Sequence, residues 1–124
     1  YYDLLQARRE AAIDDVALVR VEQLYPWPRQ TLRDLIARYP AAEVVWCQEE
    51  PANMGAWTFV FPRLVSLNEE LGRVQLLPVY VGRAEAASPA TGQHKIHVNE
   101  QAALVERALS PEPLAGCRDT GKRT

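Results

Sequence analysis

Residues 44–57 read Val-Val-Trp-Cys-Gln-Glu-Glu-Pro-Ala-Asn-Met-Gly-Ala-Trp and pass from an apolar run through a polar segment into a second apolar region. The run from Val44 to Cys47 is typical of a strand covered on both faces. Apolar residues then predominate from Ala56 to about Leu71 and predict a helix, with Pro62 in its first turns or at a kink. A further strand is predicted from Gln75 to Val81. Such a strand, helix and strand favour two parallel strands joined by a crossover helix.

The same alternation extends to both sides of this unit. The β-branched run from Val16 to Val21 predicts another buried strand, and Pro78 suits an edge position for the strand that contains it. Helical spacing of apolar residues predicts helices at residues 1–12, 32–39 and 97–109. The resulting order predicts an α/β fold of three layers, with helices on both faces of a mainly parallel sheet.

Length and composition are those of one ordinary globular domain. The chain has 124 residues, of which 48% are hydrophobic and 24% are charged, as is usual for a single domain. It does not begin with Met and opens inside a predicted helix, so we expect a piece of a longer protein. Residues 1–109 are expected to form the domain, and residues 110–124 to form a disordered tail.

Charge and cysteine content argue against several classes of function. Fourteen Lys and Arg against sixteen Asp and Glu give a formal charge of −2, without a basic cluster, so no nucleic acid partner is expected. No apolar stretch approaches the ~18 residues that span a bilayer, and no signal peptide is evident, so no membrane partner is expected. Cys47 and Cys117 are too few for a disulfide framework. We therefore expect a cytoplasmic chain with reduced thiols.

A polar segment follows each of the three predicted strands. Because the carboxyl ends of parallel strands meet at one edge of a sheet, residues 22–26, 48–57 and 82–92 are expected to lie together there. The candidate interface or effector residues of these segments and of the last helix are Glu22, Gln48, Glu49, Glu50, Asn53, Trp57, Arg83, Ser88 and His97.

These side chains leave several kinds of chemistry open. Glu49 and Glu50, with His97, are the residues on which a hydrolase would be built, because general acid and base catalysis uses paired carboxyl groups of which one can be held protonated. The same carboxylates would also stabilise the start of a helix. No third or fourth ligand stands at metal spacing beside the histidines, so no metal site is predicted. Arg83 and Lys95, with the small residues between them, would suit an anionic effector or the close approach of another domain.

Three motifs occur in order along the chain: Val-Arg-Val-Glu-Gln-Leu-Tyr-Pro at 19–26, Trp-Cys-Gln-Glu-Glu-Pro-Ala-Asn-Met-Gly-Ala-Trp at 46–57, and Gly-Arg at 82–83, followed by Ala-Ser-Pro-Ala-Thr-Gly at 87–92 and by His97. Together they resemble the C-terminal domain of 2-oxoglutarate dehydrogenase, the thiamine-diphosphate-dependent first component of its complex. The resemblance covers residues 1 to about 109.

The resemblance implies a parent enzyme that decarboxylates 2-oxoglutarate on thiamine diphosphate with magnesium. It passes the succinyl group to the lipoyl arm of the succinyltransferase component and works as a homodimer in the citric acid cycle. In that family the preceding two domains bind cofactor and substrate, while the domain resembled here packs against them and helps to form the dimer. No catalytic, cofactor-binding or metal-binding residue is therefore carried over onto this chain, and we expect the fragment alone to lack turnover.

Two departures from the family pattern bear on these expectations. In some actinobacterial relatives the domain takes part in binding acetyl-CoA as an effector. Arg83 matches the first position of an arginine pair there, but Ala84 occupies the second, which argues against that site. A small module that binds acetyl-CoA or a nucleotide on the loop from Arg83 to Lys95 is the alternative function. The family's domain also begins with a strand before the first helix, so the expected fold is transketolase C-terminal-domain-like and lacks its first strand.

Overall fold

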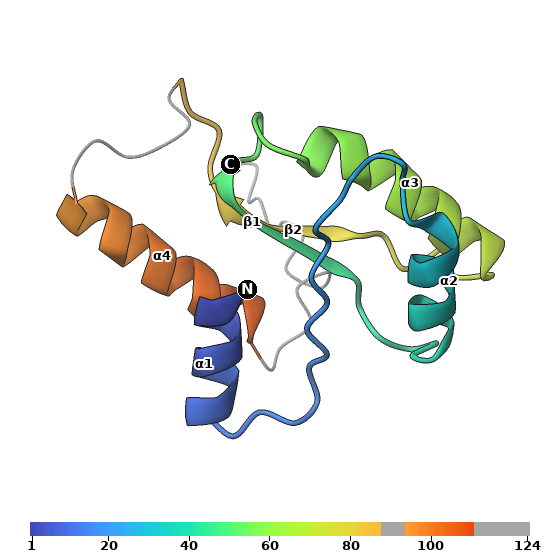
Figure 1. The fold of residues 1–124 in the computed structure, drawn as a ribbon, viewed down its shortest axis with the longest axis horizontal. Coiled ribbons are helices and arrows are strands. Elements are labelled where there is room, and N and C mark those ends of the chain that lie inside the picture. The colour runs from blue at the N-terminus through green and yellow to red at the C-terminus, as the bar shows by residue number, and fades with distance from the viewer. Residues whose placement is uncertain (88–93, 111–124) are drawn as a thin grey trace, which may run out of the picture.

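The computed structural model describes residues 1–87 and 94–110, and the side chains of all of these except residues 94–97. Its helices and strands, in chain order, are α1 (Tyr2–Glu10), α2 (Arg29–Ala37), β1 (Val45–Pro51), α3 (Trp57–Glu70), β2 (Val79–Arg83) and α4 (His94–Ala108). Within the described residues β1 and β2 form one parallel pair, and Figure 1 shows this pair between α3 and α4. The predicted α/β class, with parallel strands joined by a crossover helix, is confirmed.

The two strands are in simple register only over their first half. Val45 pairs with Val79 and Cys47 pairs with Val81, but the next paired residues are Pro51 and Arg83. Because β1 uses more residues than β2 between these pairs, it bulges just before its carboxyl end. The bulge contains Gln48, which is buried, as well as two exposed glutamates.

The main core lies on the side of the strands that α2 and α3 cover. Its buried members are Leu32 of α2 and Val60, Leu64 and Leu67 of α3. The α3 residues recur at helical spacing and form one buried face. The half-buried hydrophobic residues packed against this cluster are Val21, Leu24, Trp27, Ile36, Val44, Trp46, Ala56 and Phe59.

A buried arginine connects the end of α2 to the loop after α3. Arg73 is 7% exposed, and its guanidinium donates to the carbonyl oxygens of Ile36, Tyr39 and Ala42. Carbonyl groups at and beyond a helix C-terminus have no partner within the helix, so this side chain satisfies groups that would otherwise be desolvated. Burial lowers the pKa of Arg73.

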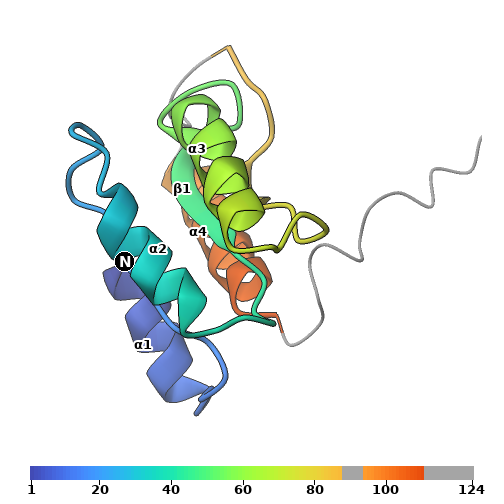
Figure 2. The ribbon, with the colours of Figure 1, turned by 90° about the vertical axis from the view of Figure 1, so that its right-hand side faces the viewer.

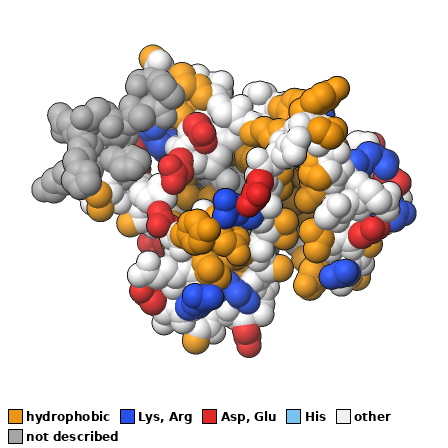
Figure 3. All heavy atoms as spheres, in the orientation of Figure 1, with side chains coloured by type: hydrophobic (Ala, Val, Ile, Leu, Met, Phe, Trp, Pro, Cys, Tyr) orange, Lys and Arg blue, Asp and Glu red, His pale blue; other side chains and the backbone are white. Residues whose placement is uncertain are grey.

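The opposite side of the strands is covered less completely. Leu104 and Leu109, from α4 and the residue after it, are buried, whereas α1 has no fully buried residue. In Figure 2, α1 lies below α2 on the left of the view, and α1 contacts α4 through the hydrogen bond from Gln101 to Asp3. Figure 3 shows hydrophobic side chains gathered on the surface where α1 begins, and Tyr2 there is 70% exposed.

The predicted strand from Val16 to Val21 is wrong. These residues lie in a segment without regular secondary structure, in which Val16, Leu18 and Val21 are half-buried and the residues between them are exposed. Val21, the last residue of this apolar run, does pack against the core. A strand also needs a neighbouring strand for its backbone N–H and C=O groups, and composition cannot supply that neighbour.

Other differences concern the ends of elements. β1 continues to Pro51 through part of the predicted polar loop, and β2 begins at Val79, directly after Pro78, whose nitrogen has no proton to donate to a strand partner. The predicted helix 32–39 lies at Arg29–Ala37, and the predicted helix 97–109 lies at His94–Ala108. Apart from its first residue, the predicted tail 110–124 lies outside the described residues. No helix within the described ranges has the length and apolar character needed to cross a membrane.

Candidate functional site

The carboxyl ends of β1 and β2 bring two of the predicted polar segments together. We call residues 48–57 and 80–86 the strand-end rim. Gln48 is its central side chain: its Oε1 accepts hydrogen bonds from the indole Nε1 of Trp46 at 2.9 Å and from the backbone N–H of Trp57 at 3.0 Å. This amide therefore connects the bulge of β1 to the first residue of α3.

The other end of the same amide faces backbone carbonyl groups. Gln48 Nε2 lies 3.2 Å from the carbonyl oxygen of Glu50, 3.0 Å from that of Pro51 and 2.8 Å from that of Met54. Two amide protons are thus shared among three acceptors. Because Gln48 is 8% exposed, its hydrogen bonds hold the loop in place and leave none for a ligand.

On the β2 side, the strand-end rim is formed by the side chain of Tyr80 and the backbone of Gly82. The Tyr80 hydroxyl lies 2.9 Å from the Glu50 carbonyl oxygen and 2.7 Å from that of Arg83, so its proton goes to one of these acceptors. Burial raises the pKa of Tyr80, which keeps this donor protonated. At Gly82 a Cβ atom would stand 2.3 Å from the Tyr80 hydroxyl and 2.8 Å from the Gln48 carbonyl oxygen. Only glycine fits between them.

Asn53 and Arg83 are paired within the chain. Asn53 donates from Nδ2 to the carbonyl oxygen of Ala86 at 2.9 Å and accepts from the Ala86 N–H at 3.1 Å. Arg83 Nε lies 2.9 Å from Oε2 of Glu100 in α4. The guanidinium that would have to meet an anionic effector is therefore already neutralised by a carboxylate.

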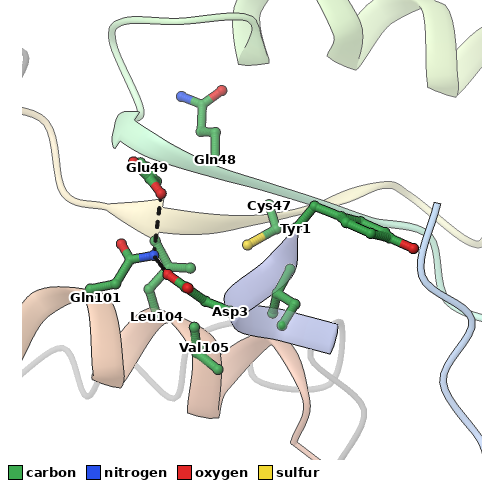
Figure 4. Close-up of a pocket in the computed structure, with 9 residues that line it drawn as sticks. Tyr1, Asp3, Cys47, Gln48, Glu49, Gln101, Leu104 and Val105 are labelled. Atoms are coloured by element: carbon green, nitrogen blue, oxygen red, sulfur yellow. Dashed lines mark hydrogen bonds between the residues drawn. The ribbon is translucent and has the colours of Figure 1, made fainter. Parts of the chain in front are cut away.

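Strand alternation places Cys47 and Glu49 on the other side of β1 from Gln48, where a pocket of about 50 Å³ lies between β1, α1 and α4. Figure 4 shows Gln101 reaching across this pocket, and its Nε2 donates to Asp3 Oδ2 at 2.9 Å and to Glu49 Oε1 at 3.3 Å. The Cys47 thiol faces the same pocket. Burial is the main cause that raises the pKa of Cys47, so the thiol stays protonated and is a poor nucleophile.

The structure brings together only part of the predicted set. Gln48, Glu50, Asn53, Trp57 and Arg83 all belong to the strand-end rim. Aromatic packing supports it, since the ring of Trp57 lies 5.5 Å from that of Tyr80, centroid to centroid.

The remaining predicted residues lie elsewhere or are not described. Glu49 belongs to the same stretch of β1, but its side chain lines the pocket and accepts a hydrogen bond from Gln101. Glu22 forms an ion pair with Arg20 at 3.2 Å in the segment before α2, and that segment does not follow a strand, so the expectation of three strand-end segments is wrong for the first. Ser88 lies outside the described residues. His97 lies in α4, and its side chain is not among those described.

Two contributors to the site could not be singled out from the sequence. Gln101 is one polar residue of a helix, and only the packing of α4 against α1 brings it to Asp3 and Glu49. Tyr80 lies inside the predicted strand from Gln75 to Val81, and its role as a donor to the rim depends on the bulge in β1. In the described part of the chain, no three His, Cys, Asp or Glu side chains are grouped so that they could hold a metal ion.

Comparison with known proteins identifies the family of this chain. The family model described as 2-oxoglutarate dehydrogenase C-terminal matches residues 1–109. The chain is 49% identical over 109 residues to proteins named 2-oxoglutarate dehydrogenase E1 component from Brucella anthropi and Brucella ovis. The match covers 88% of this chain and 11% of each relative, so the chain spans about a ninth of the length of these curated relatives. The chain belongs to the 2-oxoglutarate dehydrogenase C-terminal family.

Proposed function

We propose that this chain is the C-terminal structural and docking domain of a 2-oxoglutarate dehydrogenase, and that it has no turnover of its own. The parent enzyme would decarboxylate 2-oxoglutarate in the citric acid cycle and transfer the succinyl group to the lipoyl arm of the succinyltransferase component. The partners of the domain would be the preceding domains of the same enzyme and a second subunit of a homodimer. The enzyme would work in the cytoplasm.

The observation that carries this proposal is how the strand-end rim uses its polar groups. The amide of Gln48 and the hydroxyl of Tyr80 bind backbone groups of the rim, and Asn53 binds the backbone of Ala86. A catalytic group must instead be free to reach a reacting atom. Side chains that hold loops in one conformation are what a preformed docking surface needs, because less conformational entropy is lost on binding.

Thiamine diphosphate and magnesium are proposed to be bound by the preceding domains. Within the described ranges the residues do not fit this cofactor. Asp3 and Glu49 are two carboxylates near one pocket, but both accept from the Gln101 amide, and no third oxygen or nitrogen ligand of their class joins them. No step of the decarboxylation is assigned to this chain.

The contacts of Arg83 favour the structural role over the alternative function, a module that binds an effector. Its guanidinium pairs with Glu100 and is 15% exposed, so an anion would have to displace a carboxylate at short range. Calorimetric titration of the chain with acetyl-CoA and with nucleotides tests this alternative. Saturable heat that disappears in Arg83→Ala would favour the effector module over a purely structural domain.

The proposal is tested with a chimera of the Brucella anthropi relative. Residues 1–109 replace its matched C-terminal segment, and carbon dioxide release from 2-oxoglutarate is measured with thiamine diphosphate and magnesium. We expect the chimera to retain activity within about tenfold of the relative, a change of ~1.4 kcal/mol in activation free energy. The relative without any C-terminal segment is expected to lose its dimer, as measured by size-exclusion chromatography.

The isolated chain is the matching control. It is expected to release no carbon dioxide under the same conditions, and cofactor-dependent release from purified chain would contradict a purely structural role. Cofactor-free ester hydrolysis that Glu50→Gln abolishes would support the hydrolase interpretation instead. A chimera that is folded and dimeric but inactive would show that this domain does not substitute for that of the relative.

A further inference from the structure

A second exposed surface lies on the side of α3 that faces α2, outside the strand-end rim. In the loop before α2, Tyr25 is 82% exposed, more than any other large hydrophobic side chain among the described residues. Trp27 follows two positions later and packs edge to face on Phe59 of α3, with 6.2 Å between the ring centroids. Figure 3 shows hydrophobic side chains gathered where this loop reaches α2, toward the upper right of the view. The surface therefore begins in the loop and continues onto α3.

Arg63 completes this surface, about one helical turn after Phe59. Its guanidinium carbon lies 3.5 Å from the centroid of the Phe59 ring, and its Nη1 donates to the Phe59 carbonyl oxygen at 2.7 Å. Stacking on a ring and a hydrogen bond to a carbonyl together restrain the orientation of a guanidinium. Because a guanidinium has five N–H donors, most of those of Arg63 are not used by the described part of the chain.

The charges between α2 and α3 do not balance. Arg29 and Arg33 of α2 both reach the carboxylate of Glu70 at the end of α3, and Arg33 also lies 3.7 Å from the carboxylate of Asp34. Arg63 lies on the same side of α3 as Glu70, about two helical turns earlier. No carboxylate of the described residues pairs with Arg63. Three arginines against two carboxylates leave one positive charge in excess, although the chain as a whole carries −2.

These side chains have the chemistry of a protein-binding surface. Tyr, Trp and Arg are the residues that most often anchor protein–protein interfaces. A guanidinium held in one orientation binds a carboxylate through two parallel hydrogen bonds, and an exposed tyrosine ring offers apolar surface to a neighbouring side chain. A nucleic acid backbone fits less well, because its binding depends on several cations and only one is in excess here. The partner that fits is a peptide segment with a carboxylate next to an apolar side chain.

The size and polarity of this surface favour a transient partner over permanent packing of another domain. Obligate interfaces are large and hydrophobic, whereas this surface has one strongly exposed ring, that of Tyr25, and one charge in excess. We propose that Tyr25, Trp27, Phe59 and Arg63, the arginine–aromatic site, bind an acidic segment of a separate protein. Its carboxylate would meet Arg63, and its apolar side chain would lie on Tyr25. The inference goes beyond the proposed function, because none of these residues belongs to the strand-end rim.

The test probes an array of short immobilised peptides with the whole chain. Each peptide carries one Glu, with Leu or Phe placed in turn at every position around it, and its counterpart carries Gln in place of Glu. We expect the chain to be retained by a subset of the Glu peptides at least about fivefold more than by their Gln counterparts, because only the carboxylate gains charge-assisted hydrogen bonds from Arg63. Retention should fall as salt is added, because exposed charge pairs are screened.

Arg63→Gln and Tyr25→Ala are the informative variants. Each should reduce retention by the Glu peptides at least about fivefold, because each removes one half of the arginine–aromatic site. Arg107→Gln is the matched control, since Arg107 is an exposed arginine in the last turn of α4, and it should leave retention unchanged. Circular dichroism checks that each variant is folded. Tyr25→Ala keeps the test decisive if Arg63→Gln unfolds the chain, because the Tyr25 side chain is mostly exposed.

Several results would overturn the proposal. One is a chain that the Glu peptides retain no better than the Gln peptides, and another is retention that a folded Arg63→Gln or Tyr25→Ala variant leaves unchanged. Equal retention by a double-stranded oligonucleotide, abolished in Arg63→Gln, would assign the site to phosphate groups instead. The chimera with the Brucella anthropi relative is probed on the same array. Retention of the chain but not of the chimera would show that the rest of the enzyme covers the site, and would likewise exclude a separate partner.

Discussion

Replacement of Gln48 by glutamate tests whether the strand-end rim depends on the donors of one buried amide. Gln48→Glu preserves the size of the side chain and the acceptor for Trp46 and Trp57. It removes the two protons that now face the carbonyl oxygens of Glu50, Pro51 and Met54. At neutral pH a carboxylate would point at these three oxygens inside a buried site.

The magnitude follows from those contacts. Loss of two hydrogen bonds costs roughly 2–3 kcal/mol, and a buried carbonyl left facing a charged oxygen adds on the order of 1–2 kcal/mol, so unfolding free energy should fall by about 3–5 kcal/mol. A small domain has only ~5–15 kcal/mol of stability in total. The variant should therefore unfold at a clearly lower urea concentration at neutral pH.

The same variant should show a specific pH dependence. The neutral carboxylic acid can donate to a carbonyl oxygen and the carboxylate cannot, so the folded state should raise the pKa of the introduced group above its unfolded value. Stability from the protonated form is then fully present below the unfolded pKa, about 4.3 for glutamate, and is lost as pH rises through the folded pKa. The deficit relative to the unchanged chain should be smaller near pH 4 than near pH 8.

The assay is urea unfolding followed by far-ultraviolet circular dichroism at both pH values. Gln75→Glu is the control, because Gln75 is an exposed residue in the loop before β2 and a change there should stay within about 0.5 kcal/mol. Equal unfolding midpoints for the two variants at neutral pH would refute the reasoning. So would a deficit in Gln48→Glu that does not depend on pH.

Three further predictions concern backbone space, a thiol and a buried cation. Gly82→Ala should cost roughly 2–3 kcal/mol of unfolding free energy through overpacking, against about 1 kcal/mol for Gly72→Ala, where φ is +71° but the space is open; urea midpoints of both variants check this. In a Cys117→Ser background, Cys47 should react with iodoacetamide more slowly in the folded than in the urea-unfolded chain, because burial raises the pKa of this thiol. The protonated thiol of Cys47 contributes to folding stability below the ordinary thiol pKa, and this contribution declines as pH rises through the raised pKa of the folded state. Arg73→Leu should lower the unfolding free energy by about 2–4 kcal/mol, since three carbonyl groups lose their donor; circular dichroism melts that match those of the unchanged chain would contradict this.

The parts of the fold that could be predicted are those governed by local pattern. The α3 helix could be recognised because its apolar residues recur at helical spacing, and β1 because Val44 to Cys47 form a short apolar run between turn signals. The strand predicted from Gln75 to Val81 is present as β2, but it begins only at Val79, because proline at position 78 cannot donate to a strand partner. Each of these signals acts within a few residues.

Features that depend on distant partners could not be predicted in this way. Residues 16–21 carry the side-chain pattern of a strand, but strand formation needs a neighbour, which no local pattern reveals. The bulge in β1 is stabilised by Gln48 and Tyr80 from different strands, so its position depends on the tertiary fold. The sequence predicted that residues 22–26, 48–57 and 82–92 would lie together, and this is confirmed for residues 48–57 and the described part of 82–92, because their meeting follows from parallel topology alone.

The contacts of Gln48 also give this part of the domain an intrinsic tryptophan fluorescence signal. Two of the three tryptophans of the chain hydrogen-bond to its amide, one through the indole ring and one through the backbone. Indole emission responds to the polarity and hydrogen bonding of its surroundings, so any protein that presses on this end of the strands should alter the spectrum without an attached dye. Assembly of the full enzyme can then be followed in real time by the wavelength of its tryptophan emission.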